Sequence, residues 1–286
     1  MDFSESESDG AAAGHEGAQK SVSPAKARWT SGEAYEIWMG RWSSLLADDF
    51  LQWLALPPRA SWLDVCCGTG ILSVAIAQSC KASRVVGIDR SPPQVEFARR
   101  HHAGRGIEVH LAEATALPFA EQSFDACVAG LGLNFVPDPV AALREMRRVT
   151  RPGGTIAAYV WEYSGPVRFL REFWDVATAV DPEAASFDQG RRFPICTRDG
   201  LRAAFREAGL GGAELRALEI TTRFANFDDY WSPFLLGQGS APVYLAGRDE
   251  RIRTAIRDRL KATLPGNADG SIVLNARALA IRAPRG

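Results

Sequence analysis

Hydrophobic and polar positions follow two different periods along the chain. From Trp29 onward, large apolar residues recur at helical spacing and charged residues occupy the other faces, which predicts an amphipathic leading helix. Pro57 and Pro58 end this pattern, and the residues from there to Trp161 alternate short apolar runs with helical patterns. Such alternation is typical of βαβ units, so we predict a parallel sheet covered by helices.

The apolar runs and the periodic segments between them predict individual strands and helices. Strands are expected at 61–66, 84–88, 107–111, 123–129 and 155–159, and helices at 71–79, 92–101 and 139–149. No helical pattern connects the third and fourth of these strands.

The alternation of short apolar runs with helical patterns ends after Trp161. Helices are expected at 167–180, 198–208 and 249–263, and strands at 213–222 and 271–282. Two aromatic-rich insertions, near 161–197 and 223–270, are predicted to form a helical cap over the sheet edge. Residues 1–27 are rich in Ser, Gly, Ala and acidic residues, so we expect a disordered tail ahead of a domain spanning 28–286.

Composition and charge narrow the class of protein. The net charge of -1 argues against a general basic surface, and we expect no nucleic-acid partner. Five cysteines without paired spacing indicate reduced thiols and a cytoplasmic protein, and no apolar run is long enough for a membrane span. Four scattered histidines predict no metal site. The sequence does not predict an oligomeric state.

Candidate chemistry begins at LDVCCGTG, residues 63–70, where a predicted strand runs through a glycine turn into a helix. Glycines let the backbone approach a ligand closely, and the helix start offers free N–H groups. A second apolar strand ends in Asp89, where a carboxylate can accept hydrogen bonds from both hydroxyls of a ribose. A nicotinamide dehydrogenase would have a third glycine where Ser73 stands.

Five ordered blocks carry a resemblance to a known family. They are LDVCCGTG (63–70), GIDRSPPQVEFARR (87–100), AEATALPFAEQSFD (112–125), GLGLNFVPDPVAALREMRRV (130–149) and RPGG (151–154). With them the chain resembles the class I S-adenosylmethionine-dependent methyltransferases, in particular the group that includes the ubiquinone and menaquinone C-methyltransferases. The expected fold class is therefore α/β, a Rossmann-like doubly wound sheet, mostly parallel with an antiparallel last strand and helical cap insertions.

The resemblance implies S-adenosyl-L-methionine as cofactor and a set of residues around it. Asp89 would bind the ribose, Glu113 the adenine amino group, and Asp64 would orient the turn or reach the cofactor amino group through water. Cys66 stands where the family more often has glycine. Without its ligand, the Asp89 carboxylate is expected to be solvated. The full set is Tyr35, Arg41, Asp64, Cys66, Gly68, Gly70, Asp89, Arg90, Glu113, Ala114 and Gly130.

The implied reaction is in-line methyl transfer to a small-molecule acceptor, by an enzyme whose catalytic base, if it has one, the sequence does not identify. Residues expected near the acceptor are Asn134, Trp161, Tyr230 and Trp231. The aromatic residues among them are equally consistent with the core of the cap, and Asn134 with a turn. The alternative function is a non-catalytic or regulatory protein that binds an adenosine nucleotide on the same fold.

Overall fold

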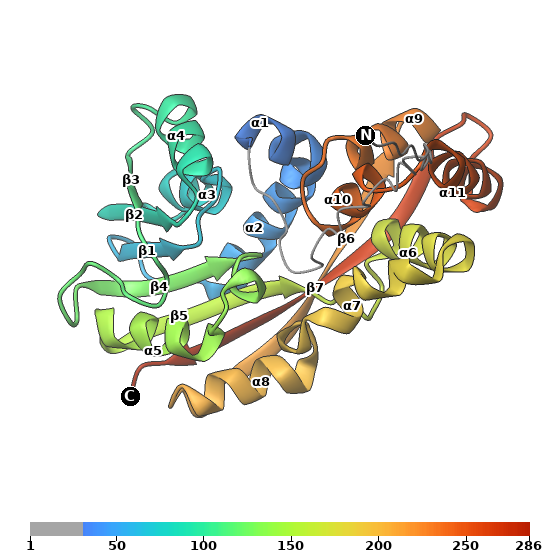
Figure 1. Cartoon of the computed structure of the whole chain (residues 1–286). Coiled ribbons are helices and arrows are strands. Elements are labelled where there is room, and N and C mark those ends of the chain that lie inside the picture. Colours follow the sequence, from blue (N-terminus) through green and yellow to red (C-terminus); the bar gives the residue numbers. More distant parts are fainter. Residues whose placement is uncertain (1–30) are drawn as a thin grey trace, which may run out of the picture.

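A computed structural model describes residues 31–286, which form a seven-stranded sheet with helices on both faces (Figure 1). The strand order is β3-β2-β1-β4-β5-β7-β6. β1 to β5 run parallel, and β7 is antiparallel to both of its neighbours, β5 and β6. The predicted fold class is confirmed. The strands are β1 (Ser61–Val65), β2 (Arg84–Asp89), β3 (Ile107–Leu111), β4 (Phe124–Gly130), β5 (Thr150–Trp161), β6 (Glu214–Phe224) and β7 (Ile272–Pro284).

The helices follow the predicted periodicity closely. Those of the main domain are α1 (Gly32–Tyr35), η1 (Glu36–Gly40), α2 (Arg41–Leu54), α3 (Ile71–Ser79), α4 (Pro92–His101), η2 (Leu133–Phe135), α5 (Pro139–Val149) and α8 (Arg198–Glu207). Those of the two insertions are α6 (Arg168–Val180), η3 (Pro182–Ser186), α7 (Gln189–Arg192), η4 (Pro194–Cys196), α9 (Phe227–Trp231), η5 (Ser232–Leu235), α10 (Ser240–Ala246) and α11 (Glu250–Thr263).

Local signals fix the boundaries of the central elements. Gly70, whose φ of 88° suits glycine, caps the start of α3, and α4 begins with two prolines, which lack the N–H that a first turn leaves free. The Asp138 side chain caps α5 by accepting from the Ala141 N–H. β4 is almost wholly buried because helices cover both faces of the sheet, and its apolar run reflects this burial.

Two elements differ from the prediction. β5 begins at Thr150 rather than 155, because Thr150 already pairs with Phe124 ahead of a register shift. The leading helix is divided into α1, the π-helical turn η1 and α2. Gly32 in α1 packs on Phe97 of α4 so closely that a Cβ there would lie 2.3 Å from the Phe97 Cγ. The predicted start at Trp29 and the predicted tail lie outside the described residues.

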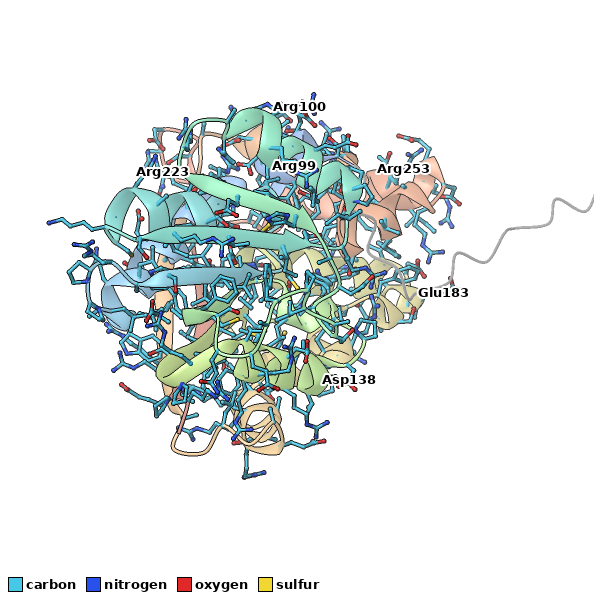
Figure 2. The ribbon with its side chains drawn as sticks, turned by 90° about the vertical axis from the view of Figure 1, so that its left-hand side faces the viewer. Arg99, Arg100, Asp138, Glu183, Arg223 and Arg253 are labelled. Atoms are coloured by element: carbon cyan, nitrogen blue, oxygen red, sulfur yellow. The ribbon has the colours of Figure 1, made fainter. Side chains whose placement is uncertain are left out.

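The two insertions, 161–197 and 223–270, pack on each other beyond the carboxyl ends of β4 and β5, and together they are called the cap below (Figure 1). The Tyr230 hydroxyl donates to the Phe169 carbonyl over 2.9 Å, and the Tyr244 hydroxyl donates to Asp181 over 2.8 Å. Of the charged residues labelled in Figure 2, Arg100, Arg253 and the cap residue Glu183 lie at the outer edge of the molecule in that view. The cap interior is accordingly aromatic, and most of its charged side chains are exposed or paired.

Candidate functional site

The glycine turn between β1 and α3 is held in left-handed backbone conformations. The φ angles are 61° at Cys66, 54° at Gly68 and 88° at Gly70. A non-glycine residue in this region is strained by about 1 to 2 kcal/mol, which explains why glycine is the commoner choice at position 66. Room for the Cys66 side chain comes from Gly132 after β4, where a Cβ would lie 2.4 Å from the Cys66 Cβ.

Asp89 joins this turn to the end of β2. Its Oδ2 accepts from the Gly68 N–H over 2.9 Å, and its Oδ1 accepts from the Ser91 N–H over 2.8 Å. Burial raises the pKa of the carboxyl, and the two backbone hydrogen bonds partly offset that rise. The expectation of a solvated carboxylate is wrong in part, because two backbone N–H groups already bind a side chain that is only partly exposed. Each oxygen keeps a second lone pair with which it can accept from a ribose hydroxyl.

Asp64 lies beneath the turn and is fully buried. Its Oδ2 accepts from the Ser73 hydroxyl over 2.7 Å, which ties β1 to the first turn of α3. Burial, with a smaller contribution from the negative charge of Asp89, raises the pKa of Asp64 from 3.8 to about 7. This geometry supports the first of the two predicted roles, orienting the turn.

Four buried oxygen atoms near the turn make no hydrogen bond of normal geometry within residues 31–286, although the Thr69 hydroxyl is close enough to Glu36 to lower the pKa of that carboxyl. They belong to Glu36, Asp64, Thr69 and Gln94. Buried polar atoms are almost always hydrogen-bonded, so such a group of exceptions indicates a place where a polar ligand completes the structure. Sequence reasoning missed Glu36 and Gln94, because a carboxylate in the leading helix and an amide in α4 carry no motif.

The adenine end of the predicted site lies where β2 and β3 finish. Arg90 and Glu113 are exposed there, with 3.9 Å between the Arg90 Nε and the Glu113 Oε1, and Ala114 beside them is buried. Tyr35 approaches from α1, and burial raises its pKa to about 12, with the charges of Glu36 and Asp89 adding to the rise. The structure thus brings these predicted residues together around one strand edge.

Arg41 lies apart from them. Its Nη1 donates to both carboxylate oxygens of Asp229 in the cap, over 3.0 and 3.1 Å, and its guanidinium stacks over Trp42 and Phe224. The side chain therefore joins the leading helix to the cap, and its predicted contact with the cofactor stays a prediction.

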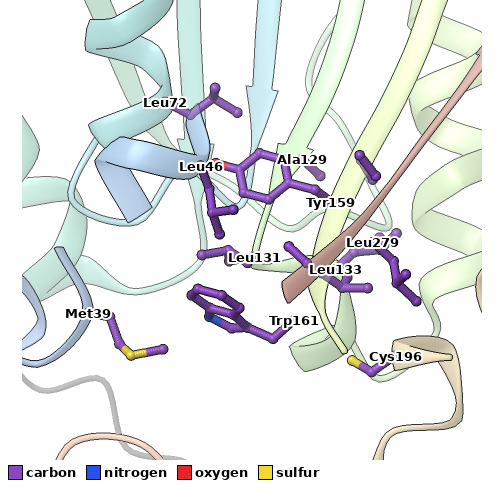
Figure 3. Packing of buried hydrophobic residues seen from close by; sticks show 14 of the residues in the cluster. Met39, Leu46, Leu72, Ala129, Leu131, Leu133, Tyr159, Trp161, Cys196 and Leu279 are labelled. Atoms are coloured by element: carbon purple, nitrogen blue, oxygen red, sulfur yellow. The ribbon is translucent and has the colours of Figure 1, made fainter. Parts of the chain in front are cut away.

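The ends of β4 and β5 hold the first two residues expected near the acceptor. Asn134 is 5% exposed and Trp161 is 1% exposed, yet in the described chain neither the Asn134 amide nor the Trp161 indole N–H makes a hydrogen bond of normal geometry. The Asn134 amide is close enough to the Tyr163 hydroxyl to lower the pKa of that group. Figure 3 shows Trp161 beside Met39, Leu131 and Leu133.

Gly130, at the end of β4, permits a close approach between strands. A Cβ at this position would lie 2.6 Å from the Tyr159 hydroxyl oxygen, so only glycine fits. The position is thereby explained by packing, and its predicted proximity to the methionine part of the cofactor stays a prediction.

Tyr230 and Trp231 lie inside the cap. The Tyr230 hydroxyl donates to the Phe169 carbonyl, and the Trp231 ring stacks with Phe227 and Phe234. Phe234 in turn meets Trp38 of the leading helix, with ring centroids 4.7 Å apart. These contacts match the expected alternative, the core of the cap, and contact with an acceptor stays a prediction for both residues.

Three further features bear on the site. All five cysteines are free thiols, and burial raises the pKa of Cys66 and Cys67 well above the ordinary value. Over residues 31–286, no cluster of three or more His, Cys, Asp or Glu side chains is arranged to hold a metal ion. None of the helices described has both the length and the apolar character needed to cross a bilayer.

Known proteins are similar to this chain in sequence and in fold. Residues 63–158 match a family model described as a methyltransferase domain. A demethylmenaquinone methyltransferase of Staphylococcus aureus (strain JH9) is 30% identical over 167 residues, which cover 54% of this chain and 69% of that protein.

Solved structures agree at the level of the fold. The YcgJ protein of Bacillus subtilis superimposes with a TM-score of 0.53 and 17% identity, covering 85% of this chain and 98% of its own. A phosphoethanolamine N-methyltransferase 2 of Haemonchus contortus was solved in complex with phosphomonomethylethanolamine and S-adenosylhomocysteine. It superimposes with a TM-score of 0.54 and 15% identity, covering 88% of this chain and 56% of its own. From the matched sequence and the strand order, the chain belongs to the class I S-adenosylmethionine-dependent methyltransferases.

Proposed function

We propose that this methyltransferase transfers the methyl group of S-adenosylmethionine to a small-molecule acceptor enclosed between the ends of β4 and β5 and the cap. The observation that carries the proposal is a pair of buried polar side chains, Asn134 in η2 just after β4 and Trp161 at the end of β5. Within residues 31–286 neither makes a side-chain hydrogen bond of normal geometry. Leaving such groups unpaired costs about 1 to 3 kcal/mol each, so they are best understood as contacts for a ligand.

The residues around the glycine turn suit the cofactor. We propose that Asp89 accepts from the ribose, that Arg90, Glu113 and Ala114 border the adenine, and that Gly68 and Gly70 let the backbone approach the methionine part. Tyr35 covers this region from α1. When bound, S-adenosylmethionine supplies a methyl group on a sulfonium centre that leaves as a neutral thioether, so positioning and exclusion of water suffice. Asp64 acts indirectly, because it orients the turn through Ser73.

Enclosure favours a small molecule over a macromolecule. Both Asn134 and Trp161 are almost fully buried, and a protein or nucleic-acid chain would have to displace the cap to reach them. The name of the Staphylococcus aureus relative also indicates a small acceptor for that protein. The same orphaned groups argue against the non-catalytic alternative, which has no use for an acceptor site.

We also propose that different segments of the chain bind the cofactor and select the acceptor. Residues 28–286 would form the methyltransferase domain, in which the insertions near 161–197 and 223–270 select the acceptor. Substitutions inside the cap should then change acceptor use more than cofactor affinity.

The test is incubation with S-adenosylmethionine labelled in its methyl group and a cell extract separated into small molecules and macromolecules. We expect labelled product in the small-molecule fraction, and we expect Asn134→Ala to reduce it strongly while calorimetry shows unchanged affinity for S-adenosylhomocysteine. Asn275→Ala, the same change at an exposed site on β7, is the control. Label found only in macromolecules would refute the proposed acceptor class. Cofactor binding without any labelled product would favour the non-catalytic alternative.

A further inference from the structure

Arg192, at the end of α7 in the cap, is a half-buried cation for which residues 31–286 provide no acidic partner. No carboxylate lies within 4.0 Å of it among the residues described, and its closest polar contact is the Ser240 hydroxyl, 3.5 Å from Nη1. Burial lowers the pKa of its guanidinium, because water is removed and no negative charge replaces it. Partly buried cations are ordinarily paired, so this one requires an explanation.

The other partly buried arginines of the region are paired. Arg171 lies 2.9 Å from Asp188, and Arg248 lies 3.2 Å from Asp181. Arg277 on β7 forms an ion pair with Glu162, just after β5. These partly buried arginines each pair with a carboxylate. Among the described residues of the cap, Arg192 is the exception, and it lies toward Asn134, where the acceptor is proposed to react.

A strip of aromatic rings connects Arg192 to that end. Its guanidinium lies over the Phe193 ring, 5.3 Å from the centroid. Phe193 meets Phe135 at 5.4 Å and Tyr163 at 6.1 Å between ring centroids. Phe135 follows Asn134 directly in η2, and the Asn134 amide is close enough to the Tyr163 hydroxyl to offset part of the rise that burial causes in its pKa.

From this arrangement we infer that the methyl acceptor is an organic anion whose carboxylate or phosphate group is bound by Arg192 and the Ser240 hydroxyl. Its apolar body lies along Phe193, and its reacting end lies by Asn134. The inference rests on the proposed function and adds the chemical class of the acceptor. Arg192 is then a specificity residue, since it contacts the acceptor away from the methyl group. A planar guanidinium is well suited to this task because it can donate two parallel hydrogen bonds to an oxyanion.

The experiment uses the small molecules of a cell extract, divided by anion exchange into a retained fraction and a flow-through. Each is incubated with the full chain and methyl-labelled S-adenosylmethionine. We expect the labelled product to come from the retained fraction. Arg192→Gln should lower kcat/KM for that fraction about tenfold to a hundredfold, mainly through KM, because a charge-assisted hydrogen bond is lost. Arg192→Lys should restore part of the loss.

Controls separate recognition from folding. Arg191→Gln removes an exposed cation from the same helix and should leave labelling unchanged. Each variant should keep the affinity of the parent for S-adenosylhomocysteine, measured by calorimetry. If Arg192→Gln does not fold, Ser240→Ala and Arg192→Lys provide the same comparison, each with a raised KM expected.

The outcomes distinguish the two proposals. Label arising only from the flow-through, or from the retained fraction with Arg192→Gln as active as the parent, overturns the anionic acceptor and leaves the small-molecule acceptor standing. Label in neither of these fractions, whether or not the macromolecules of the same extract become labelled when incubated separately, overturns both.

Discussion

Replacing Asp64 with asparagine should make the ligand-free protein more stable at neutral and alkaline pH. The folded carboxyl keeps its proton up to about pH 7, whereas the ordinary pKa is 3.8. Between these values the folded state binds more protons than the unfolded state, so stability falls as pH rises. Asparagine is nearly isosteric and cannot ionise, and its side-chain oxygen can still accept from the Ser73 hydroxyl.

The magnitude follows from the interval between the two pKa values. Each pH unit corresponds to about 1.4 kcal/mol, so the interval corresponds to about 4 kcal/mol in total. Below about pH 4 the Asp64→Asn variant and the parent should unfold with similar free energies. Above that pH the free energy of unfolding of the variant should increasingly exceed that of the parent. The difference should become constant once Asp64 is ionised in both the folded and the unfolded state.

The assay is urea denaturation of the ligand-free protein between pH 5 and pH 8, followed by tryptophan fluorescence. Asp258→Asn, the same substitution at an exposed position of α11, is the control and should show no such pH dependence. A constant difference between parent and Asp64→Asn across this range would refute the reasoning, because it would mean that Asp64 is ionised in the fold. Calorimetry with S-adenosylhomocysteine on the same variant separates the two predicted roles, since a contact with the cofactor amino group would weaken binding.

Three further predictions concern the turn and the cap. Asp89→Ala should weaken S-adenosylmethionine binding by about thirty-fold to a thousand-fold in calorimetry, and should also lower stability by about 1 to 3 kcal/mol, because two backbone N–H groups lose their acceptor. Gly132→Ala should destabilise the fold, and adding Cys66→Gly should recover much of the loss in urea denaturation, since the two positions share one space. A double-mutant cycle of Arg41→Ala and Asp229→Ala should give a coupling of about 0.2 to 1 kcal/mol, as for partly exposed ion pairs.

The fold was largely predictable because its signals are local. Apolar strands buried on both faces, proline at the start of α4 and α5, and glycine at the turn all operate within a few residues. The π-helical turn at 36–40 in the leading helix was not predictable, since no local pattern marks it. The packing of Gly32 on Phe97 was not predictable either, because it joins elements far apart in the sequence. The early start of β5 likewise depends on pairing with a distant strand.

The site was predictable to the extent that a motif places residues at strand ends. Asp64, Gly68, Gly70 and Asp89 come together because parallel strands meet at one edge. Their environments were not predictable from the motif. Whether a carboxylate at that edge is solvated depends on which N–H groups the neighbouring turn directs toward it, and the structure directs two toward Asp89.

Residues without a motif become informative only when their surroundings are known. Cys66 departs from the common glycine, and the departure is tolerated because Gly132, in another loop, leaves space for its side chain. Arg192 is one arginine among many in the sequence, and only the pairing of its neighbours identifies it as unpaired. A pattern of residues can therefore predict which cofactor a methyltransferase binds, because members of the family use the same cofactor. The acceptor has to be sought among buried groups that lack a partner, because the sequence does not record which groups those are.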